Sequence, residues 1–298
     1  MRKLLMGMVL ILALCGFALA EGGLSIVCTD FPCYDLARQV AGEGAQVSML
    51  LKPGTEAHSY DPTPADILSI GGADLFVYIG GESDAWADGI LAGFDGGDAP
   101  ATLRMMDCVA VPIEEYDHHH DGPEYDEHIW TSPKNALRMV EALGEALAAV
   151  DPENAERYRE NASAYGAEIQ AIDDEIEGIV ERAARRELVF ADRFPFIYLT
   201  REYGLDYLAA FPSCTADTEP SAQTVLTLIQ RVAKDHLPAV YTIELSTQAI
   251  ARTIAEETGV EILTLHSMQT VSQSEFDAGA TWVSIMRDNA EALRKGLN

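Results

Sequence analysis

Two histidines lie in segments that could present an imidazole to a ligand. His58 is in the segment LKPGTEAHSYDP (residues 51–62), which follows a stretch typical of a strand and precedes a predicted helix. Ligands of open α/β sheets bind at the carboxyl ends of strands, where this order of elements places His58. His128 is in EHIWTSPKN (residues 127–135), directly before two large apolar residues and a helix start. A single histidine is often a polar surface residue or a hydrogen-bonded core residue, so either segment alone is inconclusive.

An acidic tract at residues 114–127 holds three more histidines in a row, His118, His119 and His120. Histidine-rich tracts bind metals through their composition rather than through a fixed geometry. We therefore expect this tract to collect zinc with low affinity. The alternative is a solvated loop that binds nothing.

These segments together resemble those of the zinc and manganese solute-binding proteins of metal ABC importers. That family carries Pro-Gly-x-x-x-His-x-Tyr-x-Pro, then a histidine-rich acidic loop, then His-Ile-Trp-x-x-Pro-x-Asn, and all three stand here in the same order. A Tyr-Gly-Leu at residues 203–205 adds to the match. The resemblance covers essentially the whole chain and implies that His58 and His128 are metal ligands.

The other two ligand positions implied by the resemblance are altered in this chain. Counting back from the Tyr-Gly-Leu places Arg193 at the third position, and an arginine stays protonated and cannot bind a cation. Asp192, one residue away, is the candidate in its place, unless it only pairs with Arg193. At the fourth position, after the last predicted strand, His266 stands where the family usually has an aspartate. Glu244 ends another strand and is a candidate hydrogen-bond partner of a ligand imidazole, or else an acid at a helix N-terminus.

A ligand set of His58, His128 and His266, with Asp192 or a water, favours zinc. Zn²⁺ accepts imidazole nitrogen in tetrahedral sites, whereas Mn²⁺ prefers more oxygen ligands. We therefore expect Zn²⁺, with Mn²⁺ as the alternative ion.

The charge of the chain limits its partners. It has 20 Lys+Arg against 48 Asp+Glu, a formal net charge of -28. Nucleic acid is excluded as a partner, because phosphate binding needs clustered basic residues. Such acidity suits a protein that meets cations.

Residues 1–20 have the pattern of an export signal. Arg2 and Lys3 precede an apolar stretch, and Ala18-Leu19-Ala20 provides the small residues that signal peptidase recognises. We expect cleavage after Ala20 and a periplasmic or cell-surface protein; lipidation at Cys15 is the alternative. Export permits disulfides, and the other four cysteines allow three full pairings that sequence cannot separate. Those four are Cys28, Cys33, Cys108 and Cys214.

Apolar strand-like segments alternate with helical ones along most of the chain, which predicts an α/β fold with parallel sheets. We expect two lobes, each a four-stranded type of parallel sheet flanked by helices, at residues 21–150 and 187–298. Between them, residues 151–186 lack an internal proline after an Asp-Pro-Glu start and predict one long, rigid connecting helix.

The resemblance implies a binding protein that captures Zn²⁺ outside the cytoplasmic membrane. It would deliver the ion to the membrane permease subunit of an ABC importer, and we expect a monomer. An enzyme is not expected, because the chain has no His-Glu-x-x-His pair and no second metal cluster. The alternatives are a manganese-selective protein of the same type and a secreted metal-storage protein or adhesin.

Overall fold

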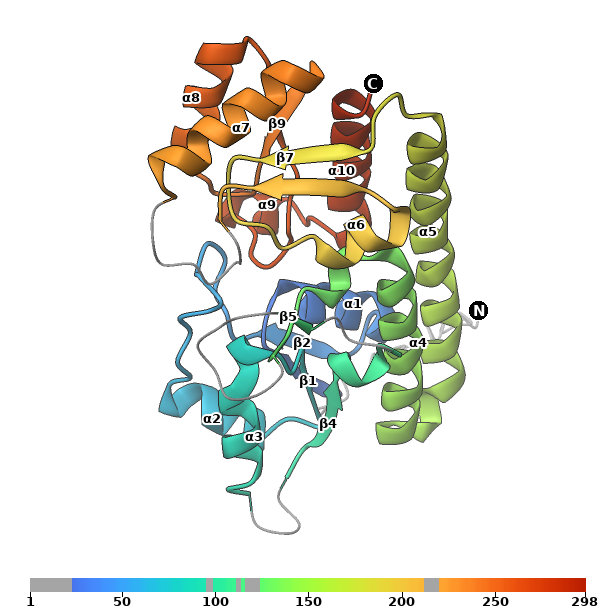
Figure 1. Ribbon diagram of the computed structural model, residues 1–298. Helices are drawn as coiled ribbons and strands as arrows, with labels where there is room; N and C mark the ends of the chain where they lie inside the picture. Colours follow the sequence, from blue (N-terminus) through green and yellow to red (C-terminus); the bar gives the residue numbers. More distant parts are fainter. Residues whose placement is uncertain (1–22, 95–98, 111–113, 116–123, 212–219) are drawn as a thin grey trace, which may run out of the picture.

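Two parallel four-stranded sheets form the framework of the protein (Figure 1). The computed structural model describes residues 23–94, 99–110, 114–115, 124–211 and 220–298. The first sheet contains β1 (Ser25–Cys28), β2 (Gln46–Met49), β3 (Leu75–Tyr78) and β4 (Ala101–Arg104). The second contains β7 (Glu187–Phe190), β8 (Asp206–Ala209), β9 (Ala239–Thr242) and β10 (Glu261–Thr264).

The two sheets share one topology. The strand orders are β2-β1-β3-β4 and β10-β9-β7-β8, so each lobe places its first and third strands side by side and its second and fourth at the edges. The direction of winding therefore reverses between β1 and β3 and between β7 and β9. In open α/β sheets such a reversal opens a crevice at the carboxyl ends of the strands. The central strands β3 and β9 are buried along their length, as expected for a parallel sheet covered on both faces.

Helices cover both sheets and line one side of the molecule (Figure 1). The first lobe has α1 (Phe31–Ala41), α2 (Pro64–Gly71) and α3 (Ala85–Leu91). The second has α6 (Ile197–Tyr203), α7 (Ala222–Asp235), α8 (Ala249–Thr258), α9 (Gln273–Asp277) and α10 (Trp282–Gly296). The described residues also include the short 3₁₀ turns η1 (Glu82–Asp84), η2 (Met105–Cys108), η3 (Ile129–Thr131) and η4 (Pro152–Asn154).

The long helix α5 (Ala155–Arg182) runs beside both lobes and packs against α4 (Pro133–Val150) and α10 (Figure 1). Its 28 residues span about 42 Å. The predicted connecting helix is confirmed but is shorter than residues 151–186. It starts after the 3₁₀ turn η4, and the backbone becomes extended at Ala183.

The lobes are also joined by buried hydrogen bonds. The Trp130 indole donates to the carbonyl of Ser267 at 2.7 Å, and the Trp282 indole donates to the carbonyl of Trp130 at 2.9 Å. The largest hydrophobic core extends without a break from β1 through α4 and α5 to α10. The second lobe is therefore packed onto the first rather than only tethered to it.

Several sequence predictions fall outside the described residues. These are the export signal with its cleavage at Ala20, Cys15, Cys214 and the histidines His118, His119 and His120. The short strands β5 (Glu114–Glu115) and β6 (Glu124–Tyr125) pair on either side of the histidine tract. Among the described cysteines, Cys28, Cys33 and Cys108 are free thiols.

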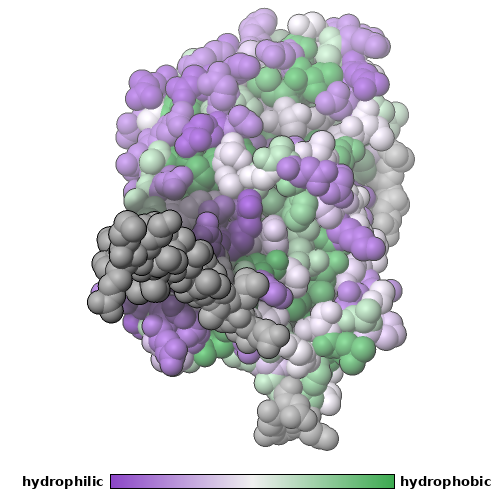
Figure 2. All heavy atoms as spheres, turned by 180° about the vertical axis from the view of Figure 1, so that it is seen from behind, coloured by the Kyte–Doolittle hydropathy of each residue, from purple (hydrophilic) through white to green (hydrophobic). Residues whose placement is uncertain are grey.

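Hydrophilic residues dominate the visible face of the second lobe, the upper part of the molecule in Figure 2. This agrees with the strongly acidic composition. No helix in the described part of the chain is both long and apolar enough to cross a bilayer.

Candidate metal centre

Loops from both lobes meet at the carboxyl ends of the strands. His58 lies between β2 and α2, Ser83 lies in η1 just after β3, and Gln269 follows β10 of the second lobe. His128 immediately precedes η3, after the β5–β6 hairpin. The two predicted ligands of the first lobe are thus brought together from segments 70 residues apart.

His58, Glu127 and His128 form a group that could hold a metal ion. Each offers one ligand atom, and these atoms all lie within 4.8 Å of one another. The two imidazole rings have centroids 5.8 Å apart and are inclined by 61°. His128 and Glu127 are buried, and only 13% of the His58 side chain is exposed. Two imidazoles that share one zinc ion need centroids roughly 5–6 Å apart, because each Zn–N bond is about 2.0–2.1 Å.

A carboxylate orients His58 through a serine. Ser83 Oγ lies 2.9 Å from His58 Nδ1, and the same hydroxyl donates to Glu127 Oε1 at 2.5 Å. The backbone N–H of Ser83 donates to the other carboxylate oxygen at 2.9 Å. Gly81 makes this approach possible, because a Cβ at that position would lie 2.2 Å from Glu127 Cβ.

A second carboxylate orients His128. Asp126 Oδ1 lies 3.1 Å from His128 Nδ1 and also accepts the backbone N–H of His128 at 2.9 Å. The carbonyl of Asp126 accepts the hydroxyl of Tyr198, from α6 of the second lobe. A carboxylate at one ring nitrogen fixes the tautomer and raises the basicity of the other, a common arrangement of metal-binding histidines.

In the sequence, Asp126 and Glu127 are two acids of the acidic tract at residues 114–127, with no separate role predicted for either. The signal that could have identified them is their position directly before His128. Ser83 and Gln269 carried no such signal.

Burial lowers the pKa of His58, because desolvation disfavours the imidazolium. The nearby charge of Glu127 raises it and only partly opposes this effect. His58 is therefore held in the neutral form that a metal ligand needs.

The structure does not bring His266 into this group. Its Nδ1 accepts the backbone N–H of Met268 at 2.9 Å, and its Nε2 lies 3.6 Å from a carboxylate oxygen of Glu275. A neutral imidazole has one ring lone pair, and that of His266 is taken by Met268. Glu244, the predicted partner of a ligand imidazole, lies 3.7 Å from His266 Nδ1 and accepts the backbone N–H of Ser267 at 2.7 Å.

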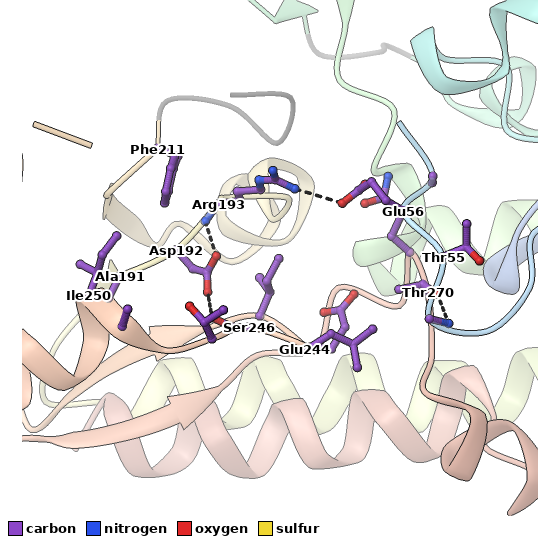
Figure 3. Close-up of a pocket in the computed structure, with 17 residues that line it drawn as sticks. Thr55, Glu56, Ala191, Asp192, Arg193, Phe211, Glu244, Ser246, Ile250 and Thr270 are labelled. Carbon is purple, nitrogen blue, oxygen red and sulfur yellow. Dashed lines mark hydrogen bonds and ion pairs between the residues drawn. The ribbon is translucent and has the colours of Figure 1, made fainter. Parts of the chain in front are cut away.

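Asp192 faces a cavity of about 420 Å³ at the carboxyl ends of the second sheet (Figure 3). It accepts hydrogen bonds from the hydroxyl of Ser246 and the backbone N–H of Arg193. The Arg193 guanidinium pairs with Glu56 of the first lobe at 3.1 Å. Among the described residues, Ser246 and Arg193 are the hydrogen-bond partners of Asp192, and neither is a predicted metal ligand.

The sequence of this chain matches a known protein family. Residues 26–296 match the family described as zinc-uptake complex component A, periplasmic. The chain belongs to this family. It is 32% identical over 283 residues to the zinc-binding lipoprotein AdcA of Streptococcus pneumoniae, covering 93% of this chain and 56% of that protein. It is 29% identical over 303 residues to the high-affinity zinc uptake system protein ZnuA of Bacillus subtilis, covering 97% and 94% of the two chains.

Solved structures agree with this assignment. The Zn(II)-bound ZnuA-like domain of S. pneumoniae AdcA superposes with a TM-score of 0.78 at 31% identity, covering 93% of this chain and 99% of that domain. Membership confirms the predicted family resemblance and the predicted fold. The description of the family and the names of these relatives include zinc, the predicted ion.

Proposed function

We propose that this protein captures Zn²⁺ outside the cytoplasmic membrane with Nε2 of His58 and Nε2 of His128. The observation that carries the proposal is the pairing of a buried and a largely buried imidazole whose Nδ1 edges are both held by acceptors. Ser83 and Glu127 hold the first ring, and Asp126 holds the second. On each ring the lone pair of Nε2 then points away from the acceptor at Nδ1, as is common in metal-binding histidines.

Zinc fits this site better than manganese does. Imidazole nitrogen suits Zn²⁺, and Mn²⁺ would require more oxygen ligands. Both oxygens of Glu127 accept hydrogen bonds from Ser83, so we assign this carboxylate to orientation and to charge compensation.

The remaining predicted ligands receive other roles in the proposal. His266 has its lone pair occupied, and Asp192 is engaged by Ser246 and Arg193. Neither is retained in the ligand set.

The inferences that the protein is exported and that it has an importer as its partner rest on its family membership. Its description is periplasmic, and the pneumococcal relative is named a lipoprotein. We infer that the chain is exported, by cleavage near Ala20 or by lipidation at Cys15, and acts as a monomer without catalytic activity. It hands zinc to the permease subunit of an ABC importer.

Zinc affinity of the purified protein, measured by competition with a chelator, tests the ligand pair. His58→Ala and His128→Ala should each weaken binding by about 100-fold or more, since a two-imidazole site loses half of its nitrogen ligands. His236→Asn is the matched control, because His236 ends α7 in a left-handed conformation that asparagine tolerates. Binding of zinc by both alanine variants as tightly as by the parent would exclude this site.

The storage alternative is tested by replacing residues 116–123 with an Asn-Gly turn. A two-residue turn can still close the β5–β6 hairpin, so Asp126 and its partner His128 are retained. We expect one tight zinc ion to remain bound. Loss of most of the bound zinc, including the tight ion, would instead favour storage by the histidine tract.

A further inference from the structure

The cavity beside the proposed zinc site is much larger than an ion needs (Figure 3). Its volume is about 420 Å³, whereas one water occupies about 30 Å³ of liquid. Ala57 and Gln269 line it, and Gln269 Nε2 lies 3.0 Å from His58 Nε2, so the cavity borders the His58 ring. A cavity of this size lies in the range of sites that bind small organic molecules.

Part of the cavity wall is apolar and strained. Phe211, Ile243 and Ile250 line it together with Leu245. The Leu245 residue is 58% exposed and has a φ of 54°, a backbone conformation that is unfavourable for a bulky residue. An exposed apolar side chain held in this way offers a surface that an organic ligand would cover and a bare ion would not.

A guanidinium in the wall lies close to His58. Arg193 Nη1 pairs with Glu56 Oε2 at 3.1 Å, and the other oxygen of Glu56 accepts the backbone N–H of His58 at 3.4 Å. Both partners of the ion pair are partly exposed, and such a pair contributes little to stability. A ligand carboxylate can therefore bind the guanidinium, which is suited to bidentate contacts.

Negative charge stands in the same wall. Asp192 and Glu244 line the cavity, and each accepts a hydrogen bond from a serine hydroxyl, which fixes its carboxylate. With Glu56, the cavity has three carboxylates against the one guanidinium of Arg193. Such a wall favours a ligand that carries an ammonium as well as a carboxylate, and it disfavours an anion that carries several carboxylates.

We propose that the cavity binds a free α-amino acid with a zinc-binding side chain, with histidine as its type, so that zinc and this small chelator are held together. The role rests on the proposed zinc site. The ligand carboxylate pairs with Arg193 and its ammonium pairs with Asp192. Zn²⁺ normally takes four ligands, and His58 and His128 supply two, so the imidazole of the ligand can occupy a further position.

The test measures binding of radiolabelled L-histidine to the purified protein by equilibrium dialysis, with saturating zinc and without zinc. The zinc-loaded protein should retain one histidine per chain, and the zinc-free protein should bind histidine more weakly. X-ray absorption at zinc should show an additional imidazole once histidine is present.

Two analogues separate the charged contacts without altering the protein. Histidinol lacks the carboxylate and imidazolepropionate lacks the ammonium, so each should bind about 10–100-fold more weakly than histidine, the usual cost of losing a hydrogen bond to a charged group. Arg193→Met should weaken histidine binding by a similar factor and leave histidinol binding nearly unchanged. Arg201→Met, on the exposed side of α6, is the matched control.

Loss of zinc from the parent as histidine is added, with no histidine retained, would show that histidine only competes for the ion. That result would overturn the proposal and leave the zinc site standing. Equal binding of histidine and histidinol by the parent would also overturn it, even if Arg193→Met does not fold. Tighter binding of citrate than of histidine would refute the assignment of a zwitterion. A parent that binds no zinc in the absence of histidine would instead refute the proposed function.

Discussion

Each proposed ligand residue depends on a neighbour that holds its ring. His58 reaches Glu127 through Ser83, and His128 reaches Asp126 directly. These acceptors decide which nitrogen is protonated, so they set how well each ring binds an ion. At the residue scale, zinc affinity therefore depends on the two ligand imidazoles and also on the three side chains that orient them.

Replacing Glu127 by glutamine should show this dependence. An amide can donate back to Ser83 and no longer demands its hydroxyl hydrogen, so the Nδ1–H of His58 loses its fixed acceptor. Zinc affinity should fall by about 10–100-fold, the usual cost of losing an outer partner of a metal ligand. Chelator competition measures the change. Glu181→Gln on the exposed side of α5 removes the same charge and should bind zinc as the parent does.

The pH dependence of zinc binding should reflect the burial of His58. Its pKa lies below the usual 6.5, so the ring stays neutral at a lower pH than a free imidazole does. Zinc affinity should therefore stay nearly level as pH falls to about 6.5 and decline only below that. Titrations from pH 8 to 5 test this, and a tenfold loss already between pH 8 and 7 would contradict it.

At the scale of elements, the start of α1 places a buried carboxylate beside the site. Asp30 caps the helix by accepting the backbone N–H of Cys33 at 3.1 Å. Burial, together with the nearby charge of Asp84, raises the pKa of Asp30 to about 8, and burial raises that of Asp84 to about 6. The helix cap thus carries a proton at a pH where an exposed aspartate would have lost it.

This pKa predicts the effect of Asp30→Asn on stability without metal. Between the usual 3.8 and about 8 the folded protein binds a proton that the unfolded chain does not. The Asp30 contribution is therefore fully present below about 4 and is lost as pH rises through 8. Asparagine keeps the cap without a charge, so the variant should gain about 1–3 kcal/mol over the parent between pH 5 and pH 8. Urea unfolding in chelator at both pH values measures the difference, and parallel pH profiles would refute it.

At the scale of the whole molecule, the lobes are joined tightly enough that any opening must be small. Asp35 of α1 is fully buried and accepts the hydroxyl of Tyr165 in α5 at 3.0 Å and the backbone N–H of Trp282 in α10 at 2.6 Å. One carboxylate thus ties the first lobe, the long helix and the last helix of the second lobe. Together with the two indole contacts, this carboxylate forms a buried junction between the lobes.

Removing Asp35 should loosen the whole junction. Asp35→Ala leaves the Tyr165 hydroxyl and the Trp282 N–H buried without their acceptor. We expect a loss of about 3–5 kcal/mol in the free energy of unfolding, as for one partner of a buried ionic network. Denaturant titration measures this, with exposed Asp174→Ala on α5 as the control. An effect no larger than that of the control would show that the junction does not depend on this carboxylate.

The sequence by itself determined the parts that depend on local signals. Apolar strands alternating with helices predicted two parallel sheets, and the uninterrupted run after Asp151 predicted α5, because periodicity and helix caps act between near neighbours. His58 and His128 could be identified because each lies in a sequence segment that matches a motif of the family.

Tertiary structure alone decided how the second lobe contributes. His266 follows a strand, as predicted, but a left-handed Met268 turns its own N–H onto the ring and uses the lone pair. Gln269 reaches His58 across 211 residues of sequence, and no local pattern distinguishes it from a surface glutamine. Which nitrogen holds a proton, and which side chain faces it, depends on contacts between segments far apart in the chain, and these exist only once the two lobes are packed together.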